Sequence, residues 1–449
     1  MKESPGPGQS RIGLRSRLEE QVVETALGAR EEVVGLLAEL VACDTTAREP
    51  GDPARDEEKL QRRLVARLEG LGAQTDLWEP EATGTGTRSI PAGLDFAGRP
   101  QLAAVLAGSG GGRSLLLNGH IDAVDATDRK DWQSDPHKLD ERNGILYGRG
   151  AADMKGGIAG LVVALETLRR LDVRLAGDIV FCTNTDEESS GAGGHMCVQH
   201  GVRADAGIVA EPTGFDAWVC CHGTVTPVIT VAGRAGHAEM PQPDWREGGA
   251  VNAIENLVPL LQGIRALREE WRVRPDHQHP LLLPGDIVPT LVRGGTWVVT
   301  YPASCDLTCN ITYLPGHVDD EGTGRRVEAD VIERLNAAVA GDQWFAEHPL
   351  AFTWTDDVVP AEMPADHPLV LTALGSAAEV GRSGRAAGLD SWHDAATFTR
   401  AGTPTFSFGP EGIETAHAVD EHLSVESLLD FTAAAALMAM RWCGVAGGR

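Results

Sequence analysis

The sequence predicts an α/β protein whose main sheet is interrupted by a smaller α+β insert. Its 449 residues exceed the roughly 250 to 300 at which single hydrophobic cores stop growing, so we expect two domains. Apolar strand-like segments alternate with amphipathic helices up to Pro212, and the same alternation returns near the C-terminus. Between these parts, strand-like segments predominate. This pattern is typical of a sheet covered by helices, with a second unit inserted between two of its elements.

The first part of the chain carries clear helix and strand signals. Residues 1–15, rich in proline and glycine, predict a flexible tail. Apolar residues at helical spacing predict helices at 31–42, 57–72 and 156–171. Continuous apolar runs predict buried strands at 101–108, 114–120, 177–185 and 206–212, and the Asn-Gly pair within 140–150 indicates a hairpin.

The pattern of predicted elements changes after Pro212, from alternating strands and helices to mostly strands. Two strand-rich stretches, 218–238 and 296–316, flank a helical stretch at 249–271. We therefore expect an insert at 213–327. A helix at 327–340 restarts the alternation, which ends in a helix near Trp442. The main domain would then comprise 16–212 and 328–449, with its sheet completed by the C-terminal segment.

Composition narrows the class of function. The chain has 39 basic and 65 acidic residues, a net charge of -26, which argues against a nucleic-acid or anionic-membrane surface and favours small-molecule substrates. No run approaches the roughly 18 apolar residues of a membrane span, and the start lacks the apolar core of a signal peptide, so we expect a cytoplasmic protein. The eight scattered cysteines predict no disulfide scaffold, and none form a CxxC pair. Any metal would be held by His, Asp and Glu.

Candidate site residues follow an apolar strand or begin a loop at five places. His120 and Asp122 share one face of an extended chain, so the carboxylate can orient the imidazole toward a metal. The other places are Asp153, the pair Glu187 and Glu188, Glu211, and His417. Strand ends share one rim of an α/β sheet, and two histidines with three carboxylates suit two borderline divalent ions bridged by one carboxylate. Alone, each place has a structural explanation, such as a helix cap for Asp153 or a solvated turn for Glu187 and Glu188.

Together, these blocks resemble the M20 family of metallopeptidases, in its acetylornithine deacetylase and succinyl-diaminopimelate desuccinylase group. The motifs "GHIDAV", "YGRGAADMKGG", "TDEESSG", "AEPT" and "AHAVDEH" occur in the family's order and at its spacing, from about Glu31 to Ala435. The resemblance implies a zinc-peptidase-like three-layer catalytic domain. It also implies that the insert is a ferredoxin-like lid through which two copies form a homodimer.

The resemblance implies two zinc ions, with cobalt or manganese as possible substitutes. His120, Glu188 and the bridging Asp153 would hold one ion, and Asp153, Glu211 and His417 the other. Asp122 would orient His120, and Glu187 would be the general base. The side chains of adjacent residues project in different directions, so Glu188 can bind metal while Glu187 faces the metal-bound water. Glu187 would take a proton from this water, leaving a hydroxide between the metals, and pass the proton to the leaving amine.

Two further residues match family positions outside these blocks. His237, in "GRAGHAEMP", matches a lid histidine that reaches the partner subunit's active site and stabilises the oxyanion. Alone, it could be an ordinary loop histidine. Asp394, in "DSWHDAATF", matches a loop that lines the substrate pocket. His277 and His279 form an HxH without a preceding strand, and we expect them on the lid surface.

The lid departs from the family pattern at two positions that bear on the substrate. Val299 and Thr312 stand where many members have an asparagine and a carboxylate-binding arginine. Threonine cannot replace a bidentate carboxylate clamp. Either Arg382 or Arg385 would then bind the substrate's carboxylate, or the substrate lacks a carboxylate. The segment "GGTWVVTYPASC" is similar to the corresponding segment in a branch of the family that includes a formyl-aminopyrimidine deformylase.

We therefore expect a metal-dependent hydrolase that cleaves the N-acyl amide bond of an acylated amino acid or related amine. Within the same class, a formyl-aminopyrimidine deformylase or a dipeptidase is the alternative. From another class, a metal-containing binding module without catalysis is the alternative. Retention of Glu187 favours the enzyme, because holding metal does not require a base.

Overall fold

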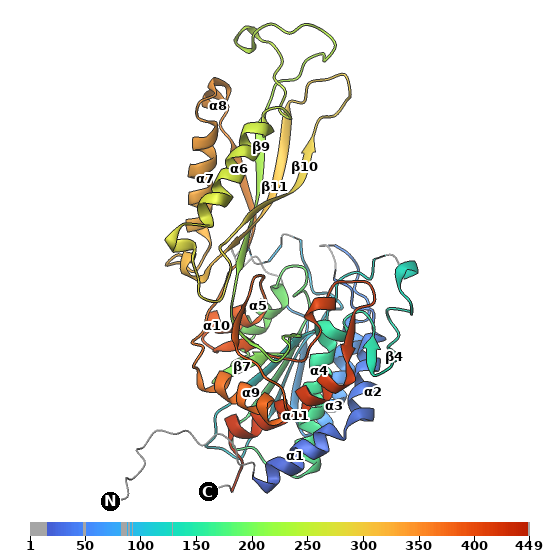
Figure 1. The fold of residues 1–449 in the computed structure, drawn as a ribbon. Coiled ribbons are helices and arrows are strands. Elements are labelled where there is room, and N and C mark those ends of the chain that lie inside the picture. Colours follow the sequence, from blue (N-terminus) through green and yellow to red (C-terminus); the bar gives the residue numbers. More distant parts are fainter. Residues whose placement is uncertain are drawn as a thin grey trace, which may run out of the picture.

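The computed structural model describes residues 16–47, 51–81, 88, 90–91, 93–127 and 129–447. The expected tail at 1–15 lies outside these residues. A broad α/β domain carries a slender second domain that projects from it (Figure 1). In the described part of the chain, no helix is long and apolar enough to cross a membrane.

The larger domain is organised around an eight-stranded mixed sheet. In spatial order its strands are β1 (Gln74–Trp78), β2 (Gln101–Leu106), β6 (Ile179–Asn184), β3 (Leu115–His120), β7 (Ala206–Val209), β14 (Thr405–Ser407), β8 (Ala217–Cys221) and β13 (Ala386–Leu389). β6, β3, β7 and β14 run parallel to one another in the middle of the sheet. β14 comes from the C-terminal part of the chain, so the expectation that this part completes the first sheet is confirmed.

Helices cover both faces of this sheet. They are α1 (Arg17–Leu27), α2 (Arg30–Val41), α3 (Glu57–Gly70), α4 (Gly156–Arg170), α5 (Ala192–Gln199), α9 (Pro368–Glu379), α10 (Ala395–Arg400) and α11 (Val425–Cys443). Leu115 and Leu117 of β3 belong to the core shared with α4 and α11, whereas Leu116 faces the core of α5 and α10. This alternation along one buried strand builds the expected three-layer domain.

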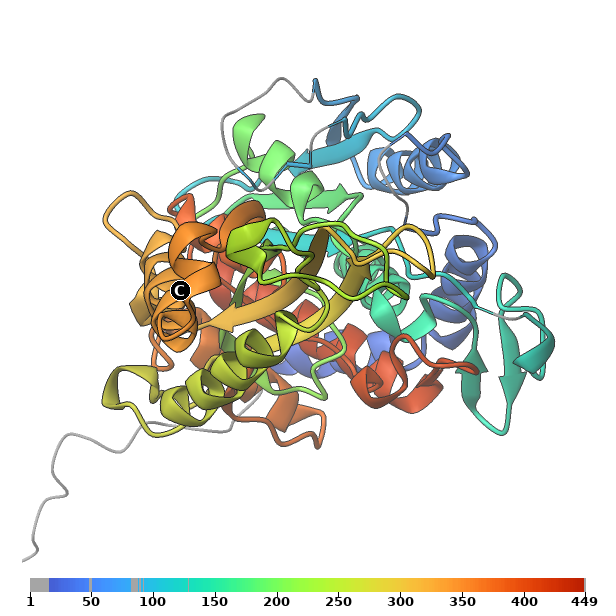
Figure 2. The ribbon, with the colours of Figure 1, turned by 90° about the horizontal axis from the view of Figure 1, so that it is seen from above.

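The second domain has the βαββαβ order of a ferredoxin-like fold. Its elements are β9 (Gly223–Ala232), α6 (Leu257–Trp271), β10 (Ile287–Gly294), β11 (Ser304–Tyr313), α7 (Arg325–Val339), the short α8 (Gln343–Glu347) and β12 (Ala351–Val358). The antiparallel sheet has the order β10-β11-β9-β12. It has its own core, into which Ile229, Leu307 and Leu335 pack. Seen from above, its helices and sheet lie over the larger domain (Figure 2).

The boundaries expected for this insert, 213–327, are wrong at both ends. β8 pairs with β13 and β14 in the main sheet, so the insert begins near Gly223. At the other end, β12 pairs with β9, and α7 packs in the second core through Val331 and Leu335. The insert therefore ends near Val358. The helix-and-strand alternation of α7 and β12 resembles that of the main domain, although β12 completes the smaller sheet and α7 packs against it.

A three-stranded sheet, with the order β15-β5-β4, lies beside the main sheet and joins two distant segments. β4 (Asp140–Arg142) and β5 (Ile145–Tyr147) form the expected hairpin, in which Asn143 and Gly144 take positive φ values of 54° and 79°. β15 (His422–Ser424) pairs with β5. The loop that precedes β15 is thereby held next to the turn that follows β5.

Candidate active site

Three parallel strands bring most of the predicted site residues to one edge of the main sheet. His120 is the last residue of β3 and pairs with Asn184, the last residue of β6. Glu187 and Glu188 lie in the turn that follows β6, and Glu211 comes two residues after the end of β7. Because the carboxyl ends of parallel strands meet at the same edge, these side chains converge although they are far apart in sequence.

Asp153 and His417 reach the same edge from loops. Asp153 lies in the turn Ala151–Lys155, directly before α4. Gly157, in the first turn of α4, packs against the carbonyl oxygen of Ala210, where an added Cβ would lie 2.0 Å from that oxygen. This close approach sets α4, and with it Asp153, against the end of β7. His417 follows the short turn Ile413–Thr415 with a φ of 62°, a conformation uncommon outside glycine.

The five predicted ligands form two groups that share Asp153. His120 Nε2 lies 3.2 Å from Asp153 Oδ1 and 3.8 Å from Glu211 Oε1. On the other side, His417 Nε2 lies 3.5 Å from Asp153 Oδ2 and 3.0 Å from Glu188 Oε2. In each group of three, one ligand atom per residue lies within 4.8 Å of the others. Asp153 thus offers one oxygen to each group.

This grouping corrects the pairing expected from the sequence. His120 groups with Glu211, not with Glu188, and His417 groups with Glu188. β7 is the neighbour of β3, so the residue that follows β7 lies beside the end of β3. The turn after β6 instead directs Glu188 toward the loop that bears His417.

The donor set fits two divalent cations. Glu188 Oε1 and Glu211 Oε1 are both buried and have no hydrogen-bond partner. Buried carboxylate oxygens without partners are costly, and a metal ion at each group would satisfy them. Imidazole together with carboxylate suits zinc and its neighbours in the first transition series.

The pKa values reflect this concentration of negative charge. Burial raises the pKa of Glu211 well above its ordinary value, and the charges of Asp153 and Glu188 raise it further. Hydrogen bonds to Asp153 and Glu188 raise the pKa of His417 to about 10. Burial alone would lower the pKa of His120, yet its hydrogen bond to Asp153 and the surrounding carboxylates raise it well above the ordinary value. Each of these shifts favours additional positive charge at the site.

Asp122 connects both halves of the site. His120 Nδ1 lies 3.0 Å from the backbone oxygen of Asp122 and 3.6 Å from its carboxylate, so the backbone oxygen is the nearer partner of the ring. The carboxylate accepts hydrogen bonds from the backbone N–H groups of Glu187 and Glu188, at 3.3 and 3.1 Å. Asp122 therefore holds the turn that presents these two glutamates.

Glu187 lines a cleft beside the two groups. Burial raises its pKa well above the ordinary value, and the charge of Glu211 adds to this effect. The cleft has a volume of about 500 Å³ and lies where the two domains meet, since Thr224 and Val358 of the small domain also line it. Trp218, Leu389, Ser391, Trp392 and His393 form much of the remaining wall.

The loop that carries Asp394 lines the cleft, whereas Asp394 itself does not. Its side chain is fully buried and accepts a hydrogen bond of 2.5 Å from Asn184 Nδ2. Burial raises its pKa to about 7. The residues before it in the same loop, Trp392 and His393, line the cleft instead.

Glu421 is a site residue that the sequence reasoning missed. Its buried carboxylate accepts a hydrogen bond of 2.7 Å from Arg149 and hydrogen bonds from the backbone N–H groups of Gly150, Ala152 and Asp153 at 2.9, 2.9 and 3.0 Å. It therefore fixes the turn that carries Asp153. Glu421 follows His417 by four residues in "AHAVDEH", but this spacing does not indicate contacts with backbone groups about 270 residues earlier in the chain.

His237 lies away from the site of its own chain. β9 leaves the larger domain and ends at the far end of the small domain, and His237 lies five residues beyond that end (Figure 1). Its side chain is exposed, and its backbone pairs with Thr300. Within one chain, the structure therefore does not bring His237 to the two ligand groups.

The histidines of the HxH motif differ from expectation. His277 is 3% exposed and stacks on Trp271, so its assignment to the lid surface is wrong. His279 is partly buried and lies 3.3 Å from Glu362.

Comparison with known proteins agrees with this geometry. The profile of Peptidase family M20/M25/M40 matches residues 116–441. The chain is 29% identical over 433 residues to an N-formyl-4-amino-5-aminomethyl-2-methylpyrimidine deformylase of Halalkalibacterium halodurans, covering 92% of this chain and 95% of the relative. It is 27% identical over 432 residues to the Bacillus subtilis protein of that name, with the same coverage.

Solved structures share the fold. A tripeptidase of Staphylococcus aureus superimposes with a TM-score of 0.69 at 17% identity, covering 92% of this chain and 98% of that chain. The YXEP protein of Bacillus subtilis, described as a dinuclear metal-binding peptidase of the M20 family, superimposes with a TM-score of 0.61 at 14% identity, covering 92% and 99%. The chain therefore belongs to peptidase family M20/M25/M40 and is a hydrolase of amide bonds.

Proposed function

We propose that this hydrolase removes a formyl group from an aminomethyl-substituted aromatic heterocycle, as the names of its deformylase relatives describe for those proteins. The observation that carries this proposal is the lining of the cleft. Among the described residues that line it, none is a lysine or arginine, whereas Trp218 and Trp392 offer aromatic rings. A flat neutral ring suits such walls better than an amino-acid carboxylate does.

Neither of the two arginines considered as substitutes for the missing clamp lines the cleft. Arg382 contacts Asp430 at 2.7 Å, Glu411 at 3.1 Å and Glu426 at 3.5 Å. The side chain of Arg385 is 85% exposed and does not line the cleft. At the clamp position itself, the Thr312 hydroxyl accepts a hydrogen bond from the backbone N–H of Asp286. These contacts favour a substrate without a carboxylate over an acylated amino acid.

We propose that His120, Asp153 and Glu211 hold one divalent ion and that Asp153, Glu188 and His417 hold the other, with zinc, cobalt or manganese as the metal. When bound, such ions polarise the amide carbonyl and lower the pKa of water. Asp153 would bridge the two ions, and Asp122 would keep His120 and the Glu187–Glu188 turn in position.

Glu187 is the proposed general base. From its place beside the two ligand groups, its carboxylate would take the proton of the attacking water and deliver it to the leaving amine nitrogen. The C–N bond then breaks to give formate and the free amine. The raised pKa of Glu187 suits this role, because a carboxyl group that holds a proton more tightly can carry it from water to amine.

We further propose that two copies associate through the small domain, so that the partner subunit's His237 completes the active site. β10 is an edge strand of the small sheet, and its Leu291 and Val292 are 54% and 56% exposed. Trp297 and Val298 in the adjoining loop are 69% and 89% exposed. An exposed apolar edge strand is a ready surface for pairing with a second copy. Sedimentation analysis of the wild-type protein and a Val292→Lys variant tests this association.

Matched substrates test the proposed activity. The assay measures kcat/KM for N-formyl-4-amino-5-aminomethyl-2-methylpyrimidine, its N-acetyl analogue, N-formylmethionine and N-acetylornithine. We expect kcat/KM for the formylated pyrimidine to exceed that for both carboxylate-bearing compounds by at least about tenfold, because no lysine or arginine is among the described residues that line the cleft. A tenfold difference corresponds to about 1.4 kcal/mol of transition-state binding. A preference for N-acetylornithine or N-formylmethionine would contradict the proposal.

A further inference from the structure

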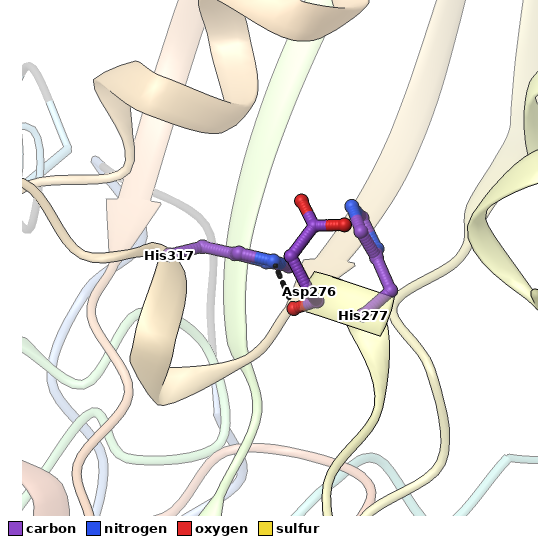
Figure 3. Close-up of side chains that lie close together, drawn as sticks. All are labelled: Asp276, His277 and His317. Atoms are coloured by element: carbon purple, nitrogen blue, oxygen red, sulfur yellow. Dashed lines mark hydrogen bonds between the residues drawn. The ribbon is translucent and has the colours of Figure 1, made fainter. Parts of the chain in front are cut away.

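A second cluster of metal-binding residue types lies at the base of the small domain, outside the site described above. Asp276 and His277 belong to the turn Pro275–His277 after α6, and His317 belongs to the turn Pro315–His317 after β11. Figure 3 shows the three side chains facing one another. One ligand atom from each lies within 4.8 Å of the others.

His317 has the tautomer of a metal ligand. Its Nε2 lies 2.8 Å from the backbone oxygen of Asp276, which can only accept, so Nε2 carries the proton and donates it. In the neutral ring, Nδ1 then has a free lone pair. That Nδ1 is buried and has no hydrogen-bond partner. Histidines that bind metal typically donate their other ring N–H to a carbonyl or carboxylate in this way.

His277 offers a second unsatisfied nitrogen. The residue is 3% exposed, and its Nδ1 also has no hydrogen-bond partner. Its ring stacks on Trp271 at 4.7 Å and lies 4.2 Å from the ring of His317. Stacking fixes the plane of the ring but does not satisfy the nitrogen, so a cost of burial remains.

Asp276 supplies an ionised carboxylate. It accepts hydrogen bonds from Arg274 Nε at 3.1 Å and Nη2 at 2.6 Å, and Arg274 lowers its pKa to about 2. A carboxylate has about four acceptor positions, so two remain beyond the guanidinium. Arg274 is also paired with Asp330 at 2.8 Å, which reduces its repulsion of a cation.

Both histidines are available in the neutral form that metals require. Burial lowers the pKa of His277 to about 4, and the charge of Arg274 acts in the same direction. Burial also lowers the pKa of His317. At neutral pH, no proton therefore has to be displaced from either ring before metal binds.

We propose that Asp276, His277 and His317 form a further metal site, which takes a borderline divalent ion such as Zn²⁺. The ion would satisfy both buried nitrogens and join the turn after α6 to the turn after β11. Tyr313, at the end of β11, pairs with Gly223 at the start of β9, where the chain enters the small domain. The site would therefore stiffen the base of this domain. With three protein ligands, water would complete the coordination.

Zinc content of full-length variants tests this site. Each protein is stripped with a chelator, equilibrated with Zn²⁺ and analysed for metal per chain. We expect His317→Gln to hold about one zinc fewer than wild type. The matched control is His348→Gln, since His348 is also a small-domain histidine stacked on a tryptophan, Trp344 at 3.7 Å, but lies outside the cluster. Equal zinc content in the two variants would overturn the proposal and leave a packing cluster only.

A measurement on the wild-type protein makes the test independent of variant folding. Hydrogen exchange of peptides covering 272–280 and 314–320 should slow when Zn²⁺ is added to the chelated protein. Unchanged exchange in both peptides at a saturating zinc concentration would also overturn the site. Neither readout involves formyl release, so the outcome is separate from that of the proposed activity.

Discussion

Replacing Glu421 with glutamine should loosen the turn that carries Asp153. In the structure, Glu421 Oε1 accepts from the backbone N–H groups of Ala152 and Asp153, and Oε2 accepts from Arg149 and the backbone N–H of Gly150. All four contacts are buried. Whichever way the glutamine amide is turned, its NH₂ group faces two donors, so two hydrogen bonds are lost.

The expected cost follows from this count. A buried donor left without a partner costs about 1 to 3 kcal/mol, so Glu421→Gln should destabilise the larger domain by roughly 2 to 6 kcal/mol. Because Asp153 is the residue shared by both ligand groups, metal affinity should fall by about 10- to 100-fold, as is usual for residues that support metal ligands. Urea denaturation and metal titration measure the two effects.

The matched control is Glu414→Gln, an exposed glutamate in the same loop. It should leave both quantities within error of wild type, because surface substitutions away from specific contacts have small effects. If Glu421→Gln unfolds at the wild-type urea concentration and binds metal with wild-type affinity, Glu421 does not hold the Asp153 turn.

Three further predictions concern the base, the partner histidine and pH. Glu187→Gln should lower kcat by about 10²- to 10⁴-fold without changing metal content; unchanged turnover would remove Glu187 from the base role. Mixing Glu187→Gln with His237→Ala chains should recover up to about a quarter of wild-type formate release, because a mixed dimer has one intact site; no recovery, with exchange of subunits verified, would contradict a shared site. Burial lowers the pKa of His393 to about 3, so below pH 6.5 the unfolded chain binds a proton at this residue that the folded chain does not. As the pH decreases below 6.5, this difference should lower the free energy of unfolding by up to about 1.4 kcal/mol per pH unit. Urea midpoints at pH 7 and pH 5 should therefore differ less in His393→Gln than in wild type, and an equal difference would refute this assignment.

Much of the larger domain could be predicted from the sequence because its strands are buried on both faces. The runs that become β3, β6 and β7 are mostly apolar and are closed or followed by polar residues, so the pattern indicates both the strands and the edge where the site lies. The Asn143–Gly144 turn was also visible, since both residues take positive φ.

The remainder depended on which strands are neighbours. The sequence does not indicate that β12 belongs to the small domain, because only its pairing with β9 assigns it there. The exchange of Glu188 and Glu211 between ligand groups follows from the order β6-β3-β7 together with the path of the turn after β6. Glu421 binds backbone N–H groups about 270 residues away in the chain, and no local pattern encodes such a contact.

The most direct test of the central claim measures metal content and formate release on the same samples of wild-type protein. With N-formyl-4-amino-5-aminomethyl-2-methylpyrimidine as substrate, zinc-loaded protein should release formate, and a chelator should abolish release as metal leaves the Asp153 groups. Restoring zinc should restore turnover in both wild type and His317→Gln but not in Asp153→Asn. Full formate release by protein that holds no metal, or by Asp153→Asn, would contradict the assignment of the site.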